Sequence, residues 1–282
     1  MLVLALASYA IYTSFRHVTA ALPPPGCQAG TGAQAITLDT DQAAIAATIA
    51  GVAARHRLPR QAVTIAYAAA LQESKLHNLD YGDRDSVGIF QQRPSEGWGS
   101  TAELEDPVYA TTKFFAALTQ VHGYTKMPVY QAAQDVQHSA DGSAYAQWSG
   151  VAGQLAGYFT GKPPHGVSCW YSPAGSADVT GAVGRMAEAF GPPGRKAVVV
   201  AISTNRSAQK NSAQKNGRIT AVLRVQRGAA WTVAGWLVAH AQAYGLSEVR
   251  YAGYQWKAAD GSMGWQPDPG PNASPRGSIV AG

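Results

Sequence analysis

One acidic residue, Glu73, lies on a predicted apolar helix face. The sequence predicts a helix over 61–76, and residues three or four positions apart share one face of a helix. The neighbours of Glu73 on that face are Ile65, Ala69 and Leu76. Desolvation raises the pKa of such a carboxyl group, and a carboxyl group that keeps its proton can act as a general acid toward a glycosidic oxygen. The alternative is that Glu73 turns outward near the helix end or pairs with a nearby Lys or Arg.

The loop after this helix carries three aspartates, Asp80, Asp83 and Asp85. Most glycosidases use a second carboxylate, and Asp85 is the nearest of the three to the Gly-Ile-Phe-Gln segment that follows. These aspartates can position a water molecule for hydrolysis, or together bind calcium. The simpler interpretation is that they accept hydrogen bonds from nearby backbone amides and form turns.

Residues 70–100 resemble the signature of the lytic transglycosylases, members of the lysozyme-like superfamily that act on bacterial cell walls. That family has Glu-Ser at the end of a helix, then a loop, then Gly-(Leu/Ile)-(Met/Phe)-Gln followed by a proline. The resemblance covers residues 40–160 and extends to the exported wall-hydrolase-like proteins of high-GC Gram-positive bacteria. The matching residues are Glu73-Ser74, Gly88-Ile89-Phe90-Gln91, Pro94 and the helix start Asp106-Pro107.

The resemblance implies a mechanism in which one carboxyl group acts twice on peptidoglycan glycan strands. Glu73 protonates the oxygen between N-acetylmuramic acid and N-acetylglucosamine, then takes the proton of the muramyl 6-hydroxyl, which closes an anhydro ring. Gln91 is expected to hydrogen-bond the sugars and Trp98 to stack on a ring, although both can instead pack on their own domain. The expected site residues around Glu73 are Ser74, Gln91, Trp98, Gln137, Tyr109, Tyr145 and Asp85.

One position departs from the family pattern. On a later helix the family has a Tyr-Asn-Ala-Gly turn whose tyrosine steadies the catalytic glutamate, and here Val136 and Gln137 replace the tyrosine and the asparagine. Either Tyr109 or Tyr145 holds Glu73 instead, or turnover is weak or absent. In the second case the chain is a catalytically silent peptidoglycan-binding or complex-docking protein with a lysozyme-like groove.

The remaining sequence predicts a mainly α lysozyme-like domain (27–170), a linker (171–180) and a small α+β domain (181–282). In the first domain the predicted helices are 40–57, 61–76, 106–121, 128–139 and 141–159, the last capped by Asp141. In the second part the predicted elements are helices over 178–190 and 231–244 and strands over 196–203, 218–225, 248–251 and 254–257. The second domain faintly resembles a module of the same wall-associated families, and we expect it to place the enzyme or contact a protein partner.

The start of the chain and its two cysteines indicate export. Residues 1–15 carry no charge and would span roughly 22 Å as a helix, short of the roughly 30 Å of a bilayer core. We therefore expect residues 1–26 to be a signal peptide or membrane anchor, with a buried N-terminal helix as the alternative. In an exported chain Cys27 and Cys169 predict one disulfide, two free buried thiols being the alternative. The expected location is extracellular or the wall side of the plasma membrane.

The composition excludes several classes of protein. Of the 282 residues, 46% are hydrophobic and 14% charged, which is too apolar for a disordered chain. The net charge of +5 is spread without a Lys/Arg run, which argues against nucleic acid and suits an anionic surface. The 7 histidines form no H-E-x-x-H pattern, so we expect neither a metal nor a cofactor. We expect four tryptophans to be core residues: Trp231, Trp236, Trp256 and Trp265.

Overall fold

The computed structural model describes residues 24–138, 142–173, 175–207, 218–268 and 277–282. The predicted signal peptide or anchor therefore lies outside the described residues except for its last three positions. Gly26 already belongs to the first strand, so the folded part begins slightly earlier than the predicted boundary. The predicted cap Asp141 also lies outside the described residues.

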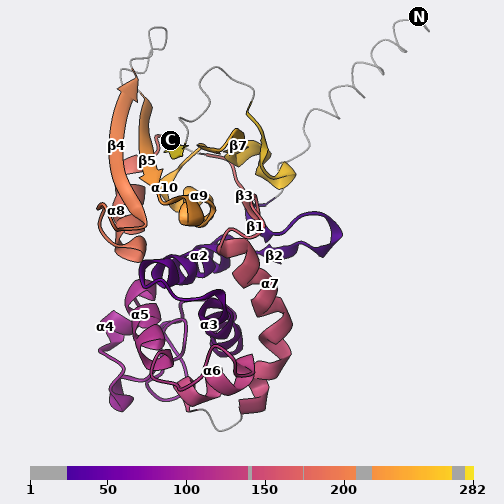
Figure 1. The fold of residues 1–282 in the computed structure, drawn as a ribbon, viewed down its shortest axis with the longest axis vertical. Helices are drawn as coiled ribbons and strands as arrows, with labels where there is room; N and C mark the ends of the chain where they lie inside the picture. The colour runs from indigo at the N-terminus through magenta and orange to yellow at the C-terminus, as the bar shows by residue number, and fades with distance from the viewer. Residues whose placement is uncertain (1–23, 139–141, 174, 208–217, 269–276) are drawn as a thin grey trace, which may run out of the picture.

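Six α-helices form the first half of the described chain and lie together at the bottom of Figure 1. Two of them begin with side-chain caps that the sequence signals: Asp39 and Gln42 form a reciprocal capping box, and Asp106 accepts a hydrogen bond from the backbone amide of Val108. A 3-10 helix, η3 (Gly142–Trp148), precedes the last helix. The helices are α2 (Thr40–Arg55), α3 (Arg60–Glu73), α4 (Thr101–Leu104), α5 (Pro107–Leu118), α6 (Val129–Gln137) and α7 (Ser149–Phe159).

Helix α3 is the centre of this half. It packs against α2, α5, α6 and α7, and every residue from Ala62 to Leu71 is buried. Alanines supply half of those ten positions, so the neighbouring helices can approach closely. The helix ends at Glu73, three residues before the predicted end, because Lys75 and Leu76 adopt left-handed backbone conformations. Leu76 is buried, but it does not continue the helical stripe of Glu73, which corrects that expectation.

A small antiparallel sheet that the sequence did not predict ties the first half of the chain to its middle. Its strand order is β2 (Ile36–Leu38), β1 (Gly26–Ala29) and β3 (Val167–Trp170). Cys27 lies directly opposite Cys169 in the β1–β3 pair, and the two form a disulfide. The predicted disulfide is thus present, and such bonds are typical of an oxidising compartment.

The second half contains a six-stranded antiparallel sheet, in the order β4-β5-β9-β6-β7-β8, accompanied by three helices. Strands β5 (Arg218–Val225), β6 (Glu248–Tyr251) and β7 (Tyr254–Lys257) have their predicted bounds. Strand β4 (Val199–Ser207) begins and ends later than predicted, and the predicted helix over 231–244 is divided at His240. The other elements are α8 (Val179–Phe190), α9 (Ala230–Ala239), α10 (Ala241–Tyr244), β8 (Gln266–Pro267) and β9 (Ser278–Ala281).

One apolar core runs through both halves. Helix α2 contacts α3 and α5 in the helical half and α8 and α9 in the other half, and it lies between them in Figure 1. The predicted linker 171–180 does not behave as a free connector, because the hydroxyl of the buried Tyr171 donates to backbone carbonyls of Ala241 and Leu246. The indoles of Trp256 and Trp265 donate to carbonyls of β3, which supports their interpretation as core residues.

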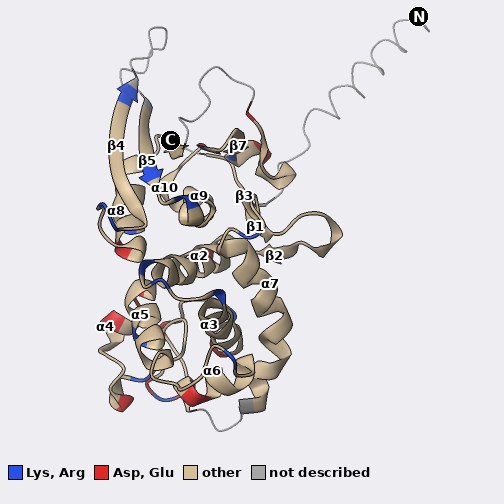
Figure 2. Cartoon of the chain, in the orientation of Figure 1, with Lys and Arg blue, Asp and Glu red and all other residues tan. Residues whose placement is uncertain are grey.

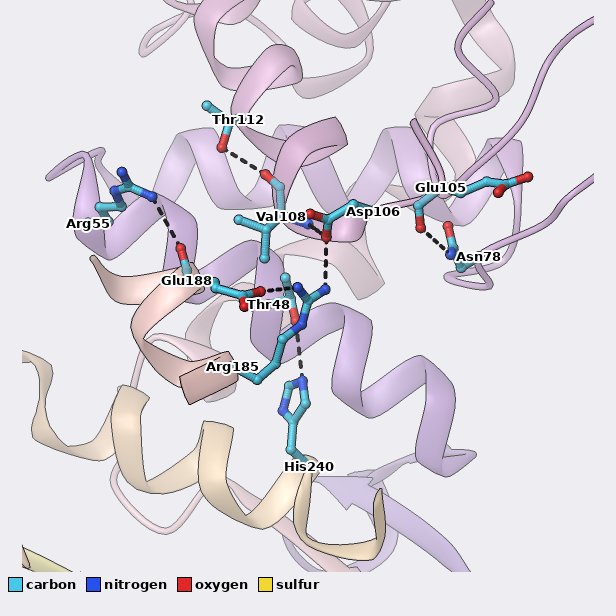
Figure 3. A network of polar contacts seen from close by, with 10 residues as sticks. All are labelled: Thr48, Arg55, Asn78, Glu105, Asp106, Val108, Thr112, Arg185, Glu188 and His240. Carbon is cyan, nitrogen blue, oxygen red and sulfur yellow. Dashed lines mark hydrogen bonds and ion pairs between the residues drawn. The ribbon is translucent and has the colours of Figure 1, made fainter. Parts of the chain in front are cut away.

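Polar contacts also join the halves (Figure 3). Arg185 of α8 donates to Asp106 at the start of α5, over 2.8 Å, and forms an ion pair with Glu188 on its own helix. Arg55 at the end of α2 donates to the backbone carbonyl of Glu188. These side chains are partly exposed, so each ion pair contributes modestly, about 0–1 kcal/mol. They connect α8 to α2 and to the start of α5.

His240, at the end of α9, is buried against α2. Its Nδ1 lies 3.0 Å from the carbonyl oxygen of Trp236, so Nδ1 carries the proton, and Nε2 accepts from the hydroxyl of Thr48 at 3.3 Å. Burial lowers the pKa of His240 to about 3. The ring is therefore neutral in the folded chain at neutral pH.

The free energy of unfolding is expected to fall by about 1 kcal/mol between pH 7 and pH 5.5 because of His240. Over that range the unfolded chain takes up a proton at this residue, whereas the folded chain does not, so acid favours unfolding. Urea unfolding at the two pH values measures the change. A His240→Gln variant should lose this part of the pH dependence, and equal pH dependence in both proteins would contradict the prediction.

Among the helices of the described residues, none has the length and apolar character needed to cross a bilayer.

Candidate functional site

The candidate site forms where the C-terminal end of α3 meets α6 and η3. Glu73 is the last residue of α3 and is half-buried there. Burial raises the pKa of its carboxyl group above the usual value, while hydrogen bonds from Tyr145 and Gln137 and the positive charge of Lys75 oppose that rise. The balance favours a carboxyl group that is protonated more readily than an exposed glutamate.

Tyr145 holds the Glu73 carboxyl group. Its hydroxyl donates to Oε1 of Glu73 over 2.6 Å, and its ring is fully buried. Of the two tyrosines that the sequence offered for this task, Tyr145 is thus the one in contact with Glu73. Tyr109 lies elsewhere, with its hydroxyl 3.4 Å from the carbonyl oxygen of Trp98.

Gln137 connects Glu73 to the loop that carries the Gly-Ile-Phe-Gln segment. Its Nε2 donates to the backbone carbonyl of Phe90 over 2.7 Å, and its side chain also hydrogen-bonds Glu73. Its Oε1 is buried without a hydrogen-bond partner among the described residues. A buried acceptor without a partner carries an energetic cost, so its position beside Glu73 is notable.

Ser74 fixes the same loop from the other side. Its hydroxyl lies 2.8 Å from the carbonyl oxygen of Ile89 and 3.1 Å from that of Ala70, and the residue is buried. Gly88 has φ +77°, and a Cβ there would lie 2.3 Å from the carbonyl oxygen of Leu104, so only glycine fits. Ser74 therefore holds the loop next to Glu73, and its hydroxyl already donates to backbone carbonyls of the protein.

Two adjacent glutamines in this loop behave differently. The Gln91 amide donates to the carbonyls of Tyr81 and Gly88, which holds the turn. Gln92 is 3% exposed, and neither its Nε2 nor its Oε1 has a partner among the described residues. Gln92 was not among the site residues predicted from the sequence. Its backbone pairs with that of Val87 across the turn, a contact that the residue types in this segment do not signal.

Asp85 organises the loop that follows. It accepts hydrogen bonds from the backbone amide and hydroxyl of Ser95 and from Nε of Arg93, all at 2.8–3.0 Å. These hydrogen bonds, above all that from the Ser95 amide, lower the pKa of Asp85 to about 2. The contacts of Asp85 therefore agree with the interpretation that it stabilises a turn. Within the described part of the chain, no three His, Cys, Asp or Glu residues are grouped so as to hold a metal ion.

The remaining predicted site residues, Trp98 and Tyr109, lie together on the loop before α4 and on α5. Trp98 is partly buried and packs against the apolar core. Among the described contacts, none joins Asp85, Trp98 or Tyr109 to Glu73. The structure thus brings together Glu73, Ser74, Gln137, Tyr145 and the 88–92 turn. Asp85 and Trp98 lie elsewhere in the loop, and Tyr109 lies on α5.

The surroundings of the site on the η3 side carry polar and aromatic groups. The indole of Trp148 donates to Oε1 of Gln72 over 2.8 Å, and Nζ of Lys75 lies 4.5 Å from the centre of the Trp148 ring. A hollow of about 340 Å³ opens over α6 and η3. Its lining includes Gln134 and Ser143 but not Glu73.

The sequence matches no protein-family model and none of the curated proteins with which it was compared.

Removing the Tyr145 hydroxyl is expected to raise the pKa of Glu73, because the hydrogen bond from this hydroxyl stabilises the ionised carboxylate and is then lost. The Tyr145→Phe variant tests this through the carboxyl ¹³C shift of Glu73, followed by NMR as the pH is changed. Tyr109→Phe is the matched control and should leave the pKa unchanged. A Glu73 pKa that is equal in the wild-type protein and Tyr145→Phe would show that the hydroxyl does not act on this carboxyl group.

Proposed function

We propose that this chain cleaves the glycan strand of peptidoglycan, with Glu73 as its single general acid and base. The observation that carries the proposal is a half-buried carboxyl group, raised in pKa by burial and held at 2.6 Å by a buried tyrosine, at the end of a helix. The resemblance of the segment around Glu73 to lytic transglycosylases adds to it. On this proposal the helical half has a lysozyme-like fold.

In the proposed reaction, Glu73 gives its proton to the oxygen that links N-acetylmuramic acid to N-acetylglucosamine, and that bond breaks. The carboxylate left behind takes the proton of the muramyl 6-hydroxyl, whose oxygen closes the anhydro ring. Glu73 thus ends protonated as it began, and no water is consumed. Tyr145 stabilises the carboxylate between the two steps, since its hydroxyl donates to Oε1.

One candidate partner for a substrate amide lies beside Glu73. Oε1 of Gln137 has no hydrogen-bond partner among the described residues, and because this atom is buried, a substrate amide would reach it only when the side chain turns outward. N-acetyl groups of peptidoglycan sugars carry one amide donor and one acceptor each. We assign Gln137 as the first contact of such a group, because its side chain also touches Glu73.

The proposed location is outside the cytoplasm, on the wall side of the plasma membrane, with the segment before β1 as signal or tether and the second half as a contact for a protein partner. The disulfide between Cys27 and Cys169 supports an oxidising compartment.

A catalytically silent wall-binding protein is the second candidate. The hydrogen bonds from Tyr145 and Gln137 favour it, since both stabilise the ionised form of Glu73 and so oppose its action as an acid. In this case the surface around Glu73 would bind glycan strands without breaking them.

Product analysis separates these candidates. The purified chain is incubated with peptidoglycan, and the released muropeptides are identified by mass spectrometry. Anhydromuropeptides are expected, and reducing muramyl ends would instead mean that water is the nucleophile. Binding to peptidoglycan without released products would favour the silent protein and contradict the proposed cleavage.

A further inference from the structure

A second hollow, far larger than the one beside α6, lies where the two halves of the chain meet. It has a volume of about 870 Å³, within the roughly 300–1,000 Å³ typical of small-molecule sites. The end of α2, the start of α3, the end of α8 and the segment before α9 all contribute to its lining. Glu73 lies at the opposite end of α3 from this hollow, so the hollow is separate from the candidate active site.

The rim of the hollow is strongly cationic. Five basic residues contribute to the lining, and all five are exposed: Arg55, Arg57, Arg60, Lys162 and Lys196. The described lining contains no Asp or Glu. Figure 2 shows blue segments at the end of α2, near the base of α8.

These cations are not neutralised by carboxylates in the described residues. Arg55 and Arg57 each donate to a backbone carbonyl, those of Glu188 and Lys196. Arg60 begins α3, whose N-terminus has no side-chain cap, so the helix adds partial positive charge to the same rim. A site with this charge attracts an anion with several oxygen atoms, such as a phosphate ester.

The floor of the hollow is apolar. Ala53, Val63 and Phe190 lie at its base and are each 1% exposed. The apolar surface that a ligand can reach comes from partly exposed lining residues: Ala54, Leu58, Ala197 and Ala229. A free phosphate ion would gain nothing from such a floor, whereas a lipid chain would lose its contact with water there. Nucleic acid fits less well, because the buried Phe190 presents no exposed ring on which a base could stack.

We propose that this hollow binds one anionic phospholipid, with the phosphate among the five rim cations and the first carbons of the acyl chains on the apolar floor. The proposal does not depend on the chemistry assigned to Glu73.

Calorimetric titration of the full chain with dihexanoyl phosphatidic acid, kept below its micelle concentration, tests the site. Saturable binding of one molecule is expected. Dihexanoyl phosphatidylcholine has the same acyl chains but no net charge, and inorganic phosphate has the charge but no acyl chain. Each should bind at least about tenfold more weakly than phosphatidic acid, because each lacks one of the two features that the site is proposed to recognise. No saturable phosphatidic acid binding, or equal affinity for either control compound, would overturn the proposal.

Two variants locate the binding. Arg57→Gln combined with Arg60→Gln removes two exposed rim charges and should weaken phosphatidic acid binding about tenfold or more. Lys126→Gln combined with Lys257→Gln removes the same charge from exposed positions outside the hollow and should leave the affinity unchanged. Leu58→Asn should weaken binding through the floor, with a thermal unfolding curve to show that the protein is folded.

Unchanged affinity in the double arginine variant would overturn the proposed site. Two further results would also do so: adsorption to phosphatidylglycerol vesicles without binding of the monomeric lipid, which would mean a surface patch, and displacement of the lipid by a single-stranded oligonucleotide, which would mean a nucleic-acid site.

Discussion

Replacing Glu73 by Gln is expected to lower muropeptide release at neutral pH by about 10²–10⁴-fold, the range that a general acid and base contributes. Gln has nearly the shape of Glu but carries no transferable proton, so both proton transfers of the proposed reaction are lost. Its carbonyl oxygen can still accept the hydrogen bond from Tyr145, so the variant should fold and bind glycan strands. The rate of soluble muropeptide release from purified peptidoglycan measures the change.

Glu105→Gln is the matched control for this substitution. The carboxylate of Glu105 takes part in none of the hydrogen bonds or ion pairs of the described residues, although its backbone carbonyl accepts from Asn78, as Figure 3 shows. This variant should release muropeptides at the wild-type rate. Equal release by the wild-type protein and Glu73→Gln would remove Glu73 from the mechanism.

The pH dependence of release should report the same carboxyl group. A general acid is active while protonated, so the rate should decline as the pH rises through the pKa of Glu73, which burial places above its usual value. Tyr145→Phe raises that pKa further and should move the decline to higher pH.

The position of Glu73 could be predicted from the sequence, because helical periodicity alone places its side chain on the face of Ile65 and Ala69, both of which are buried. From the sequence, the residue that hydrogen-bonds the Glu73 carboxyl group could be restricted only to two candidates, Tyr109 and Tyr145. Tyr145 lies 72 residues further along the chain, and its approach depends on the path of η3, which has no clear sequence pattern. Gln92 was missed because side-chain burial in a tight turn is set by the turn itself, not by residue type.

The long helices were predictable for a similar reason, as were the short strands β6 and β7, whereas β1, β3 and β9 were not. β1 and β3 have four residues each and contain no clear alternation, and β9 has four residues that become central only because β5 and β6 pair with its two sides. Tyr171 lies in the segment that was expected to be a linker. Its burial could not be predicted, because its hydrogen-bond acceptors, the carbonyls of Ala241 and Leu246, are distant in the sequence. Contacts made across such distances leave no local signal.

Loss of the Cys27–Cys169 disulfide is expected to lower the free energy of unfolding by about 2–5 kcal/mol. The bond joins residues 142 positions apart, so it removes many extended conformations from the unfolded chain. It also holds β1 against β3, whose carbonyls accept hydrogen bonds from Trp256 and Trp265 of the second half. Urea unfolding of the wild-type protein and of Cys27→Ala combined with Cys169→Ala measures the difference.

Two controls separate the contribution of the disulfide from that of the packing around it. A reducing agent should lower the urea midpoint of the wild-type protein but leave that of the double alanine variant unchanged. Ser168→Ala keeps the disulfide and removes only the hydrogen bond from Ser168 to the carbonyl of Gly261, so its cost should be about 1 kcal/mol. If Ser168→Ala destabilised the chain as much as the double variant, the packing of β3 and not the covalent link would hold the two halves together. Because the link closes the sheet that joins the helical half to the rest, we expect the covalent contribution to be the larger one.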